Sequence, residues 1–391
     1  MSAPTSDARD QSGRDDMEWR VRFIDYPAQF RKMEDELLGT IRTVLSRGDL
    51  MLRQQLRDFE ANFAAFVGTR LAVGTSNCTD ALHLALRAAG VGPGHEVITV
   101  AHTFVATAAA IHHAGATPVL VDIGDDHLMD IDQVAAAISP RTRAIVPVHL
   151  NGRLCDMDQL LRLAEDSGLL LIEDAAQALG ASLHGTCAGA FGVAGCFSFY
   201  PAKLLGAYGD AGAMTTHSTD IAEKVTALRD HGRTGPGELS GWSFNCRMDN
   251  LQAALLDLKL PRVRDWIQQR RRLAGMYHER LAELDQILLP PPPAESGPRV
   301  DVFQNFEIEA RDRDGLVAFL RSRGVEILLP WGGRAVHQFK TLELTHFSLP
   351  RTERLFRDVL MLPLHTELHD DHVEYVCETI HEFYRRKGRR S

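Results

Sequence analysis

The chain has 391 residues, of which 45% are hydrophobic and 24% are charged, and its formal net charge at pH 7 is -9. This length predicts one large domain and a smaller one, and the acidic balance argues against general nucleic-acid binding, which requires a basic surface. No apolar run approaches membrane-spanning length, so a soluble, cytoplasmic protein is expected.

The first seventeen residues are polar and contain no apolar core segment. They are therefore predicted to be a disordered leader, residues 1–17, and not a signal peptide. The six cysteines are spread along the chain without a CxxC pair. This spacing predicts reduced, mostly buried thiols, with neither a zinc site nor a disulfide framework.

Apolar residues recur at helical spacing in residues 30–45 and 54–67. From Leu71 onward, short apolar runs alternate with helical stretches. The runs predicted as strands are 71–73, 96–100, 118–121, 144–146 and 169–172, and the stretches predicted as helices are 80–89, 107–113, 131–138 and 157–166. This alternation predicts an α/β fold with a mostly parallel sheet between helices and a ligand site at the carboxyl ends of the strands.

The second half of the chain begins with a long amphipathic stretch, residues 249–284, which Pro261 is expected to break or kink. The proline run at 290–293 predicts a surface connection or a domain boundary. We therefore expect a large domain over residues 18–284 and a small α/β domain over residues 285–391, the latter with helices near residues 315–323 and 372–385.

Two segments follow predicted strands in the first half of the sheet. Residues 74–80 are small or carry hydroxyl groups and lead into a helix, so their free N–H groups suit a phosphate. An ordinary helix cap by Asn77 or Thr79 explains the same residues. In the second segment, Phe104 follows a strand and suits the face of a planar cofactor, although a core phenylalanine is the alternative.

Two further segments carry ionisable groups. Glu173 and Asp174 end an apolar strand, where a buried carboxylate is costly unless a positive group meets it. A protonated pyridine nitrogen is such a group; a metal ion is the alternative, but no Walker loop accompanies it. Lys203 lies among aromatic, leucine and glycine residues, which predicts a desolvated amine of lowered pKa that favours imine formation. Taken alone, it would be a solvent-facing loop lysine.

Together, these segments resemble the sugar aminotransferases of the DegT/DnrJ/EryC1/StrS family, which are fold-type I enzymes dependent on pyridoxal phosphate. The resemblance runs from about Phe23 to the C-terminus. Its strongest stretches are GHEVITVAHTFVATAAAIHHAGATPVLVDI, AIVPVHLNGRLCDMDQL, LLIEDAAQALGA, FSFYPAKLLGAYGDAGA and FNCRMDNLQAA. Several specific motifs in the family's order make a chance agreement improbable.

The resemblance implies a role for each matching residue. Lys203 would be the Schiff-base lysine and Asp174 the partner of the pyridine nitrogen. The other implied cofactor contacts are Gln177 to the phenolic oxygen, Phe104 stacked on the ring, Cys78, Thr79 and Ser198 at the phosphate, and Asn245 reaching the phosphate from the neighbouring subunit of a homodimer. Cys78 departs from the Gly or Ala that is usual at its position.

The implied reaction moves an amino group from glutamate or glutamine to a keto-sugar in amino-sugar biosynthesis. The resemblance suggests that this keto-sugar is linked to a nucleotide. Trp331, Arg334 and His337 fall where relatives place residues that bind the acceptor, although packing of the loop against the large domain explains them equally well. No metal is expected.

Other functions have to be weighed against this one. Elimination or racemisation could run on the same scaffold, and the amino acceptor could be an inosose-like cyclitol. Dehydration is disfavoured, because family members that dehydrate carry histidine where this chain has Lys203. A regulatory protein that binds pyridoxal phosphate without catalysis would be expected to lose Lys203 or Asp174. A cysteine or metal hydrolase lacks a readable arrangement of nucleophile and base.

Overall fold

Two helices begin the described part of the chain, which runs from residue 18 to residue 388 in this computed structural model. Helix α1 (Tyr26–Arg47) begins where the Asp25 side chain accepts a hydrogen bond from the Ala28 N–H, and helix α2 (Gln54–Val67) follows it. The helices predicted at 30–45 and 54–67 are confirmed. The leader predicted for residues 1–17 lies outside the described residues.

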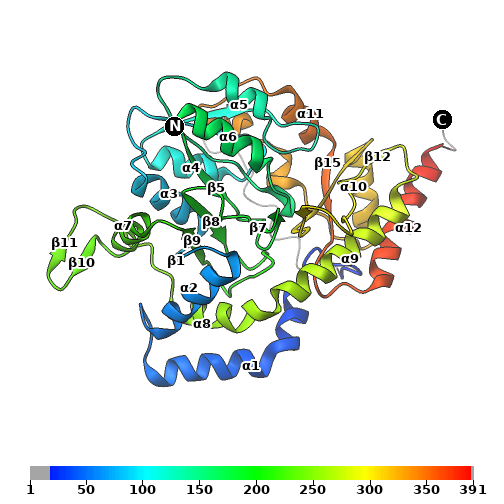
Figure 1. Cartoon of the computed structure of the whole chain (residues 1–391). Coiled ribbons are helices and arrows are strands. Elements are labelled where there is room, and N and C mark those ends of the chain that lie inside the picture. Colours follow the sequence, from blue (N-terminus) through cyan, green and yellow to red (C-terminus); the bar gives the residue numbers. More distant parts are fainter. Residues whose placement is uncertain (1–17, 389–391) are drawn as a thin grey trace, which may run out of the picture.

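A seven-stranded sheet forms the centre of the molecule, with strand order β1-β9-β8-β5-β4-β2-β3 (Figure 1). Its strands are β1 (Leu71–Thr75), β2 (Glu96–Val100), β3 (Thr117–Val121), β4 (Thr142–Ile145), β5 (Leu170–Asp174), β8 (Ala194–Ser198) and β9 (Gly212–Thr216). Strand β9 pairs antiparallel with both neighbours, and the remaining pairs are parallel. The predicted strands all belong to this sheet, so the predicted mainly parallel, mixed sheet is confirmed.

Both faces of this sheet are buried. Val97 and Ile172 belong to one hydrophobic cluster, whereas their chain neighbours Ile98 and Leu171 belong to another. Successive side chains of a strand point to opposite faces, so the two clusters are the cores on the two sides of the sheet. The covering helices include α3 (Cys78–Ala88), α4 (Val105–His113), α5 (Ile131–Ala137), α6 (Met157–Ser167) and α7 (Thr219–Arg229).

The long amphipathic stretch forms two helices, α8 (Asn250–Lys259) and α9 (Val263–Leu281). A single 3-10 turn, η2 (Leu260–Arg262), joins them and contains Pro261. The break expected at this proline is confirmed. Its cause is the missing N–H of proline, which interrupts the α-helical hydrogen-bond pattern.

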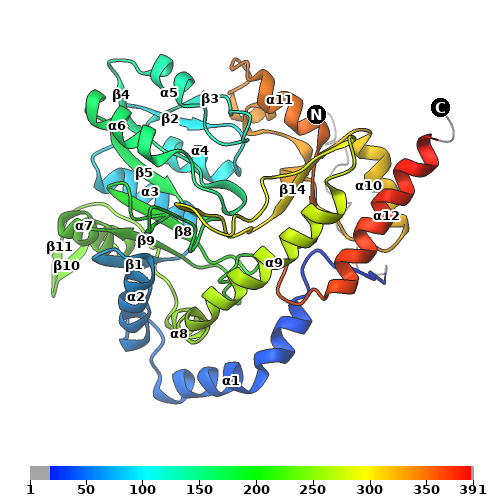
Figure 2. The same cartoon turned by 45° about the vertical axis from the view of Figure 1, so that its right-hand side comes forward.

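A second, smaller sheet lies beyond the central one, with strand order β12-β14-β15. Its strands are β12 (Ile287–Leu288), β14 (Phe306–Ala310) and β15 (Val359–Leu362). Helices α10 (Arg313–Ser322) and α11 (Pro350–Asp358) lie between β14 and β15 in the chain, and α12 (Asp370–Gly388) follows β15. Its core also contains Leu273, Tyr277 and Leu281 of α9. This C-terminal α/β unit therefore shares α9 with the part of the chain that precedes the proline run (Figure 2).

Short strands that the sequence did not predict complete the architecture. Strands β6 (Ser182–Leu183), β7 (Thr186–Cys187) and β13 (Arg299–Val300) form a small sheet, and β10 (Arg233–Gly235) pairs with β11 (Glu238–Leu239). The β10–β11 hairpin projects from the body of the molecule in both views (Figures 1 and 2). Three 3-10 turns, η3 (Pro330–Gly333), η4 (Val336–Gln338) and η5 (Lys340–Leu342), precede α11.

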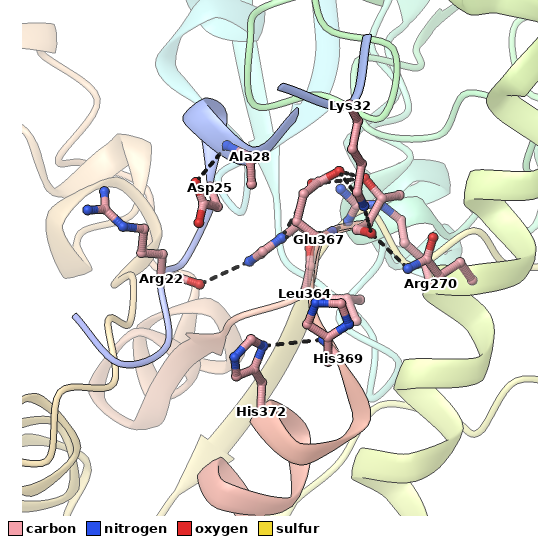
Figure 3. A network of polar contacts seen from close by, with 12 residues as sticks. Arg22, Asp25, Ala28, Lys32, Arg270, Leu364, Glu367, His369 and His372 are labelled. Carbon is pink, nitrogen blue, oxygen red and sulfur yellow. Dashed lines mark hydrogen bonds and ion pairs between the residues drawn. The ribbon is translucent and has the colours of Figure 1, made fainter. Parts of the chain in front are cut away.

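The N-terminal segment is tied to the segment that follows β15, as Figure 3 shows. His365 Nε2 lies 3.1 Å from the Arg22 carbonyl oxygen, and Lys32 Nζ donates to the Thr366 carbonyl oxygen at 3.2 Å. Lys32 Nζ also lies 3.5 Å from Glu367 Oε1. Parts of the chain that are more than 300 residues apart in sequence are thereby held together.

Within residues 18–388, no helix is long and apolar enough to cross a membrane.

Candidate active site

A cavity of about 570 Å³ opens at the carboxyl ends of the central strands. It is bounded by the first turns of helices α3 and α4, by the ends of β5 and β8, and by the segments that enter the smaller sheet. Residues that the sequence placed far apart meet here: Cys78, Thr79, Phe104, Asp174, Gln177, Ser198, Lys203 and Trp331 all line it.

Asp174 ends strand β5 and is only 5% exposed. Its Oδ2 accepts a hydrogen bond from the Thr107 hydroxyl at 2.7 Å, and its Oδ1 accepts one from the Ala176 N–H at 3.2 Å. Burial raises the pKa of this carboxyl, and the bonds from Thr107 and Ala176 oppose that rise in part. Both hydrogen-bond donors are uncharged, and the nearby Lys203 and His149 offset the effect of burial only in part.

Lys203 lies on a tight turn that follows β8. Its N–H donates to the Tyr200 carbonyl oxygen at 2.8 Å, and the Ala207 N–H donates back to Phe199 at 2.8 Å. A Cβ on Gly206 would lie 2.4 Å from the Pro201 carbonyl oxygen, so only glycine fits the end of this turn. Burial lowers the pKa of the Lys203 amine, against the opposing effect of Cys78 and Asp174.

The first turn of α3 forms one wall of the cavity. The Asn77 side chain caps the helix by accepting from the Asp80 N–H at 2.8 Å, and Cys78 and Thr79 are the first helical residues. The first N–H groups of a helix have no partner within it, so they suit an anion. A Cβ on Gly212 of β9 would lie 2.3 Å from the Asn77 carbonyl carbon, which shows how closely this turn packs on the sheet.

The thiol of Cys78 is buried in this turn. Burial raises its pKa well above the usual value, and the nearby Asp174 carboxylate adds to the rise. The thiol is therefore held neutral, and a neutral thiol adds no charge that would repel an anion at the helix terminus. A cysteine at position 78, in place of glycine or alanine, is therefore compatible with an anion site at this helix terminus.

Phe104, Gln177 and Ser198 surround the remaining space. Phe104 is the N-cap residue of α4 and is 54% exposed, so it is not a core phenylalanine. Gln177 Oε1 accepts from the Asn151 N–H at 2.9 Å and from Asn305 Nδ2 at 3.0 Å. The Ser198 hydroxyl accepts from the Tyr200 N–H at 3.3 Å and thereby contacts the turn that carries Lys203.

The remaining candidate residues differ in their placement. Trp331 lines the cavity and adopts a left-handed conformation, with a φ of 47°. Arg334 is exposed, and His337 is buried with its Nε2 3.3 Å from Glu353 Oε1; neither lines the cavity. Asn245 is exposed, follows the β10–β11 hairpin and does not line the cavity of its own chain either.

The structure brings in residues that the sequence did not single out. His149, Arg270, Gln304 and Asn305 also line the cavity. His149 Nδ1 accepts from the Cys155 N–H at 3.2 Å, so its proton is on Nε2, which donates to Glu173 at 3.0 Å. His149 stands in one of the stretches that carry the family resemblance, whereas Gln304 and Asn305 stand in the run VFQNF, which forms no local chemical motif.

Glu173 points away from Asp174, as expected for successive residues of a strand. Besides His149, it accepts hydrogen bonds from the backbone N–H groups of Gly189, Phe191 and Gly192, at 2.7 to 2.8 Å. It therefore fixes a loop, while Asp174 faces the cavity. Among residues 18–388 no group of three or more His, Cys, Asp or Glu is arranged to hold a metal ion.

The model of the DegT/DnrJ/EryC1/StrS aminotransferase family matches residues 31–381. Among curated relatives, the chain is 40% identical over 369 residues to a Geobacillus stearothermophilus protein named pleiotropic regulatory protein, covering 93% of this chain and 99% of that protein. It is 39% identical over 363 residues to the UDP-N-acetyl-3-dehydro-alpha-D-glucosamine 3-aminotransferase of Acidithiobacillus ferrooxidans, covering 92% of this chain and 97% of the relative.

Among solved structures, the fold matches that of DesV from S. venezuelae, which was crystallised in complex with a ketimine intermediate. The TM-score is 0.90 at 38% sequence identity, and the match covers 94% of this chain and 99% of DesV. The match to the family model and the match to this solved structure therefore both extend over nearly the whole chain.

Proposed function

The chain belongs to the DegT/DnrJ/EryC1/StrS aminotransferase family, and we propose that it transfers an amino group from glutamate or glutamine to a nucleotide-linked keto-sugar. The observation that carries the proposal is the pairing of Asp174 and Lys203 in one cavity, with pKa shifts in opposite directions. The printed activity of the A. ferrooxidans relative supports a nucleotide sugar as the acceptor.

The cofactor of this family of aminotransferases is pyridoxal phosphate, and the cavity offers groups that fit it. The Asp174 carboxylate is buried and accepts hydrogen bonds only from uncharged donors, so it would suit a protonated ring nitrogen. The turn at Cys78 and Thr79, with Ser198, suits the phosphate, and exposed Phe104 offers an aromatic face to the ring.

When bound, the cofactor supplies an electron sink for the bond that breaks at the donor's Cα. Asp174 would support this role of the cofactor, because an ionised carboxylate keeps a ring nitrogen protonated. Lys203 first holds the cofactor through its amine. Once free, the same amine would take the proton from the donor's Cα and hold it within the cavity. The burial that lowers the pKa of Lys203 favours the neutral amine that this step requires.

The proposal includes a homodimer in which Asn245 of each subunit completes the phosphate site of the other. Asn245 is exposed and follows the projecting β10–β11 hairpin, outside the cavity of its own chain. These features support a role in a neighbouring subunit and oppose one in the same chain. Two-fold symmetry then gives two equivalent sites.

Absorbance spectroscopy tests the proposal. We expect the purified protein with added pyridoxal phosphate to develop a visible band that glutamate or glutamine converts to a band at shorter wavelength, and Lys203→Ala to abolish the first band. A panel of nucleotide-linked keto-sugars should then restore the original spectrum, with mass spectrometry of the aminated product. A band that no amino acid discharges would favour a regulatory role, such as the name of the G. stearothermophilus relative describes. The complete lack of a band would refute cofactor binding.

A further inference from the structure

Residues Val302–Asn305 lie in the connection from β13 to β14 and pack against the candidate active-site cavity; we refer to them as the strap. The Val302 N–H donates to the Gly152 carbonyl oxygen at 2.9 Å. Phe303 is buried in a left-handed conformation with a φ of 51°, which is unusual for a bulky residue. A Cβ on Gly152 would lie 2.6 Å from the Phe303 nitrogen, so the two segments are in close contact.

The strap is fixed from its other side by Arg270 of α9. The buried guanidinium donates from Nη1 to the carbonyl oxygens of Phe303 at 3.3 Å, of Gln304 at 3.0 Å and of Leu364 at 2.7 Å. A conformation that is rare for phenylalanine persists only where its surroundings determine it. The strap is therefore a rigid element, and its side chains have defined positions.

Gln304 contacts both peptide groups that flank the catalytic lysine. Its Oε1 accepts from the Leu204 N–H at 2.8 Å, and its Nε2 donates to the Ala202 carbonyl oxygen at 3.0 Å. A backbone N–H only donates and a carbonyl only accepts, so the orientation of this amide is unambiguous. The strap thus holds the turn that carries Lys203.

Asn305 contacts the amide of Gln177 in the same way. The Asn151 N–H donates to Gln177 Oε1, and because a backbone N–H cannot accept, this atom must be the oxygen. Asn305 Nδ2 donates to the same oxygen at 3.0 Å and to Asn151 Oδ1 at 2.9 Å. With its oxygen occupied by two donors, Gln177 has its NH₂ group left to serve the cavity.

We infer that Asn305 is a positioning residue, which orients the Gln177 amide so that its NH₂ group donates a hydrogen bond to the phenolic oxygen of the bound cofactor. The inference rests on the proposed function, since it needs the cofactor in the cavity. A donor at this oxygen stabilises the deprotonated form of the lysine-linked chromophore, so it lowers the pH at which the visible band titrates. Without Asn305, only the Asn151 N–H holds the Gln177 oxygen, so the amide is less tightly oriented and part of that stabilisation is lost.

The test is a pH titration of the visible band of the cofactor-loaded protein. Asn305→Leu keeps the size of the side chain but removes the donor, and we expect the titration midpoint to rise by about 1 pH unit. Gln177→Leu removes the donor itself and should give a rise at least as large, and the double variant no more than Gln177→Leu alone. Val302→Ala, a change in the packing of the same strap, is the matched control and should leave the midpoint in place.

Asn305→Asp supplies a second variant should Asn305→Leu fail to fold, because its carboxylate keeps the shape but cannot donate to Gln177; its midpoint should also rise. An unchanged midpoint in both Asn305 variants, with a raised one in Gln177→Leu, would overturn the inference. So would a rise on Asn305→Leu that persists in full when Gln177 is already leucine. If the wild type itself shows no visible band, the proposed function fails, which is a different outcome.

Discussion

The Thr107 hydroxyl donates to Asp174 Oδ2 across 2.7 Å, from the first turns of helix α4 to the end of strand β5. The Thr103 and Thr107 hydroxyl oxygens are also 2.7 Å apart, so the two threonines form a short chain that ends on the carboxylate. This chain opposes the rise in the pKa of Asp174 that burial causes. The ionised state of Asp174 thus depends on helix α4 as well as on the strand that carries it.

Thr107→Val should weaken cofactor binding. The change keeps the shape of the side chain but removes a hydrogen bond to a charged acceptor, at a cost of about 1 to 2 kcal/mol, or roughly tenfold in the dissociation constant of pyridoxal phosphate. Because the pKa of Asp174 rises further, binding should also be lost at a higher pH as the solution is acidified. Thr99→Val is the matched control, since Thr99 is buried but donates to the Val146 carbonyl oxygen. Equal effects of the two changes on binding would contradict the assignment.

Asp174→Asn should raise the melting temperature of the cofactor-free protein at neutral pH. The folded-state pKa of Asp174 is raised, so ionising this carboxyl destabilises the folded state at every pH above its unfolded pKa of about 3.9. The stabilisation by asparagine should be present near pH 7 and should disappear towards acidic pH, where both states are protonated. Calorimetry as a function of pH measures it.

Asp122→Asn is the control for that experiment. Asp122 is also buried, but it accepts hydrogen bonds from three backbone N–H groups and from the Thr352 hydroxyl. Asparagine cannot accept all of these bonds, so the control variant should melt at a lower temperature than the wild type. A loss of stability in Asp174→Asn as well would show that the Asp174 carboxylate is better compensated than its surroundings indicate.

A row of ionisable groups between the two sheets should make stability depend on pH. His127 lies 3.5 Å from Glu307 Oε1 and 3.1 Å from Glu309 Oε1, and His102 Nε2 lies 3.5 Å from Glu307 Oε2. Burial opposes the charge on His127, but the two glutamates raise its pKa to about 9. The stabilisation from a raised histidine pKa is complete below the unfolded value of about 6.5 and is lost as the pH rises to about 9.

His127→Asn tests this dependence, because asparagine tolerates the φ of 64° that His127 adopts. The wild type should exceed the variant in unfolding free energy by on the order of 2 kcal/mol near pH 6, with the difference shrinking towards pH 9. His184→Asn is the control: His184 also has a positive φ and pairs with Asp158, but both side chains are about half exposed. A pH-independent difference for His127→Asn would refute the role of the ion pairs.

Hybrid dimers test whether Asn245 acts across the subunit interface. Lys203→Ala and Asn245→Ala should each inactivate the homodimer. A purified hybrid of the two variants would contain one site with both changes and one intact site, so it should recover about half of the wild-type activity. If Asn245 served the site of its own chain, each site of the hybrid would carry one change, and the hybrid would be inactive.

The main features of the sheet and the meeting of Asp174 and Lys203 in one cavity were predictable, for the same physical reason. Parallel strands end at one edge of a sheet, so polar residues that follow predicted strands meet there, however far apart they are in the chain. The positions of Cys78, Phe104, Asp174 and Ser198 around one cavity follow from this rule. Pro261 was equally readable, because its effect on a helix is local.

Gln304 and Asn305 were not predictable in this way. They contact Leu204 and Gln177 across 100 and 128 residues of sequence, through single amide groups that no periodicity marks. Their positions depend on the left-handed Phe303, on Gly152 and on Arg270, so they emerge only when three separate segments are packed together. The two-residue strands β6, β7 and β11 were missed because they are too short to show alternation.

The proline run at residues 290–293 separates two parts of the chain that share one hydrophobic core. Leu273, Tyr277 and Leu281 precede the run, yet they are buried in the core of the sheet that follows it. Two fragments cut in the run would each expose apolar surface that only the other can cover. Such fragments, produced separately, would be inactive until they associate. Recovery of activity would then report that association.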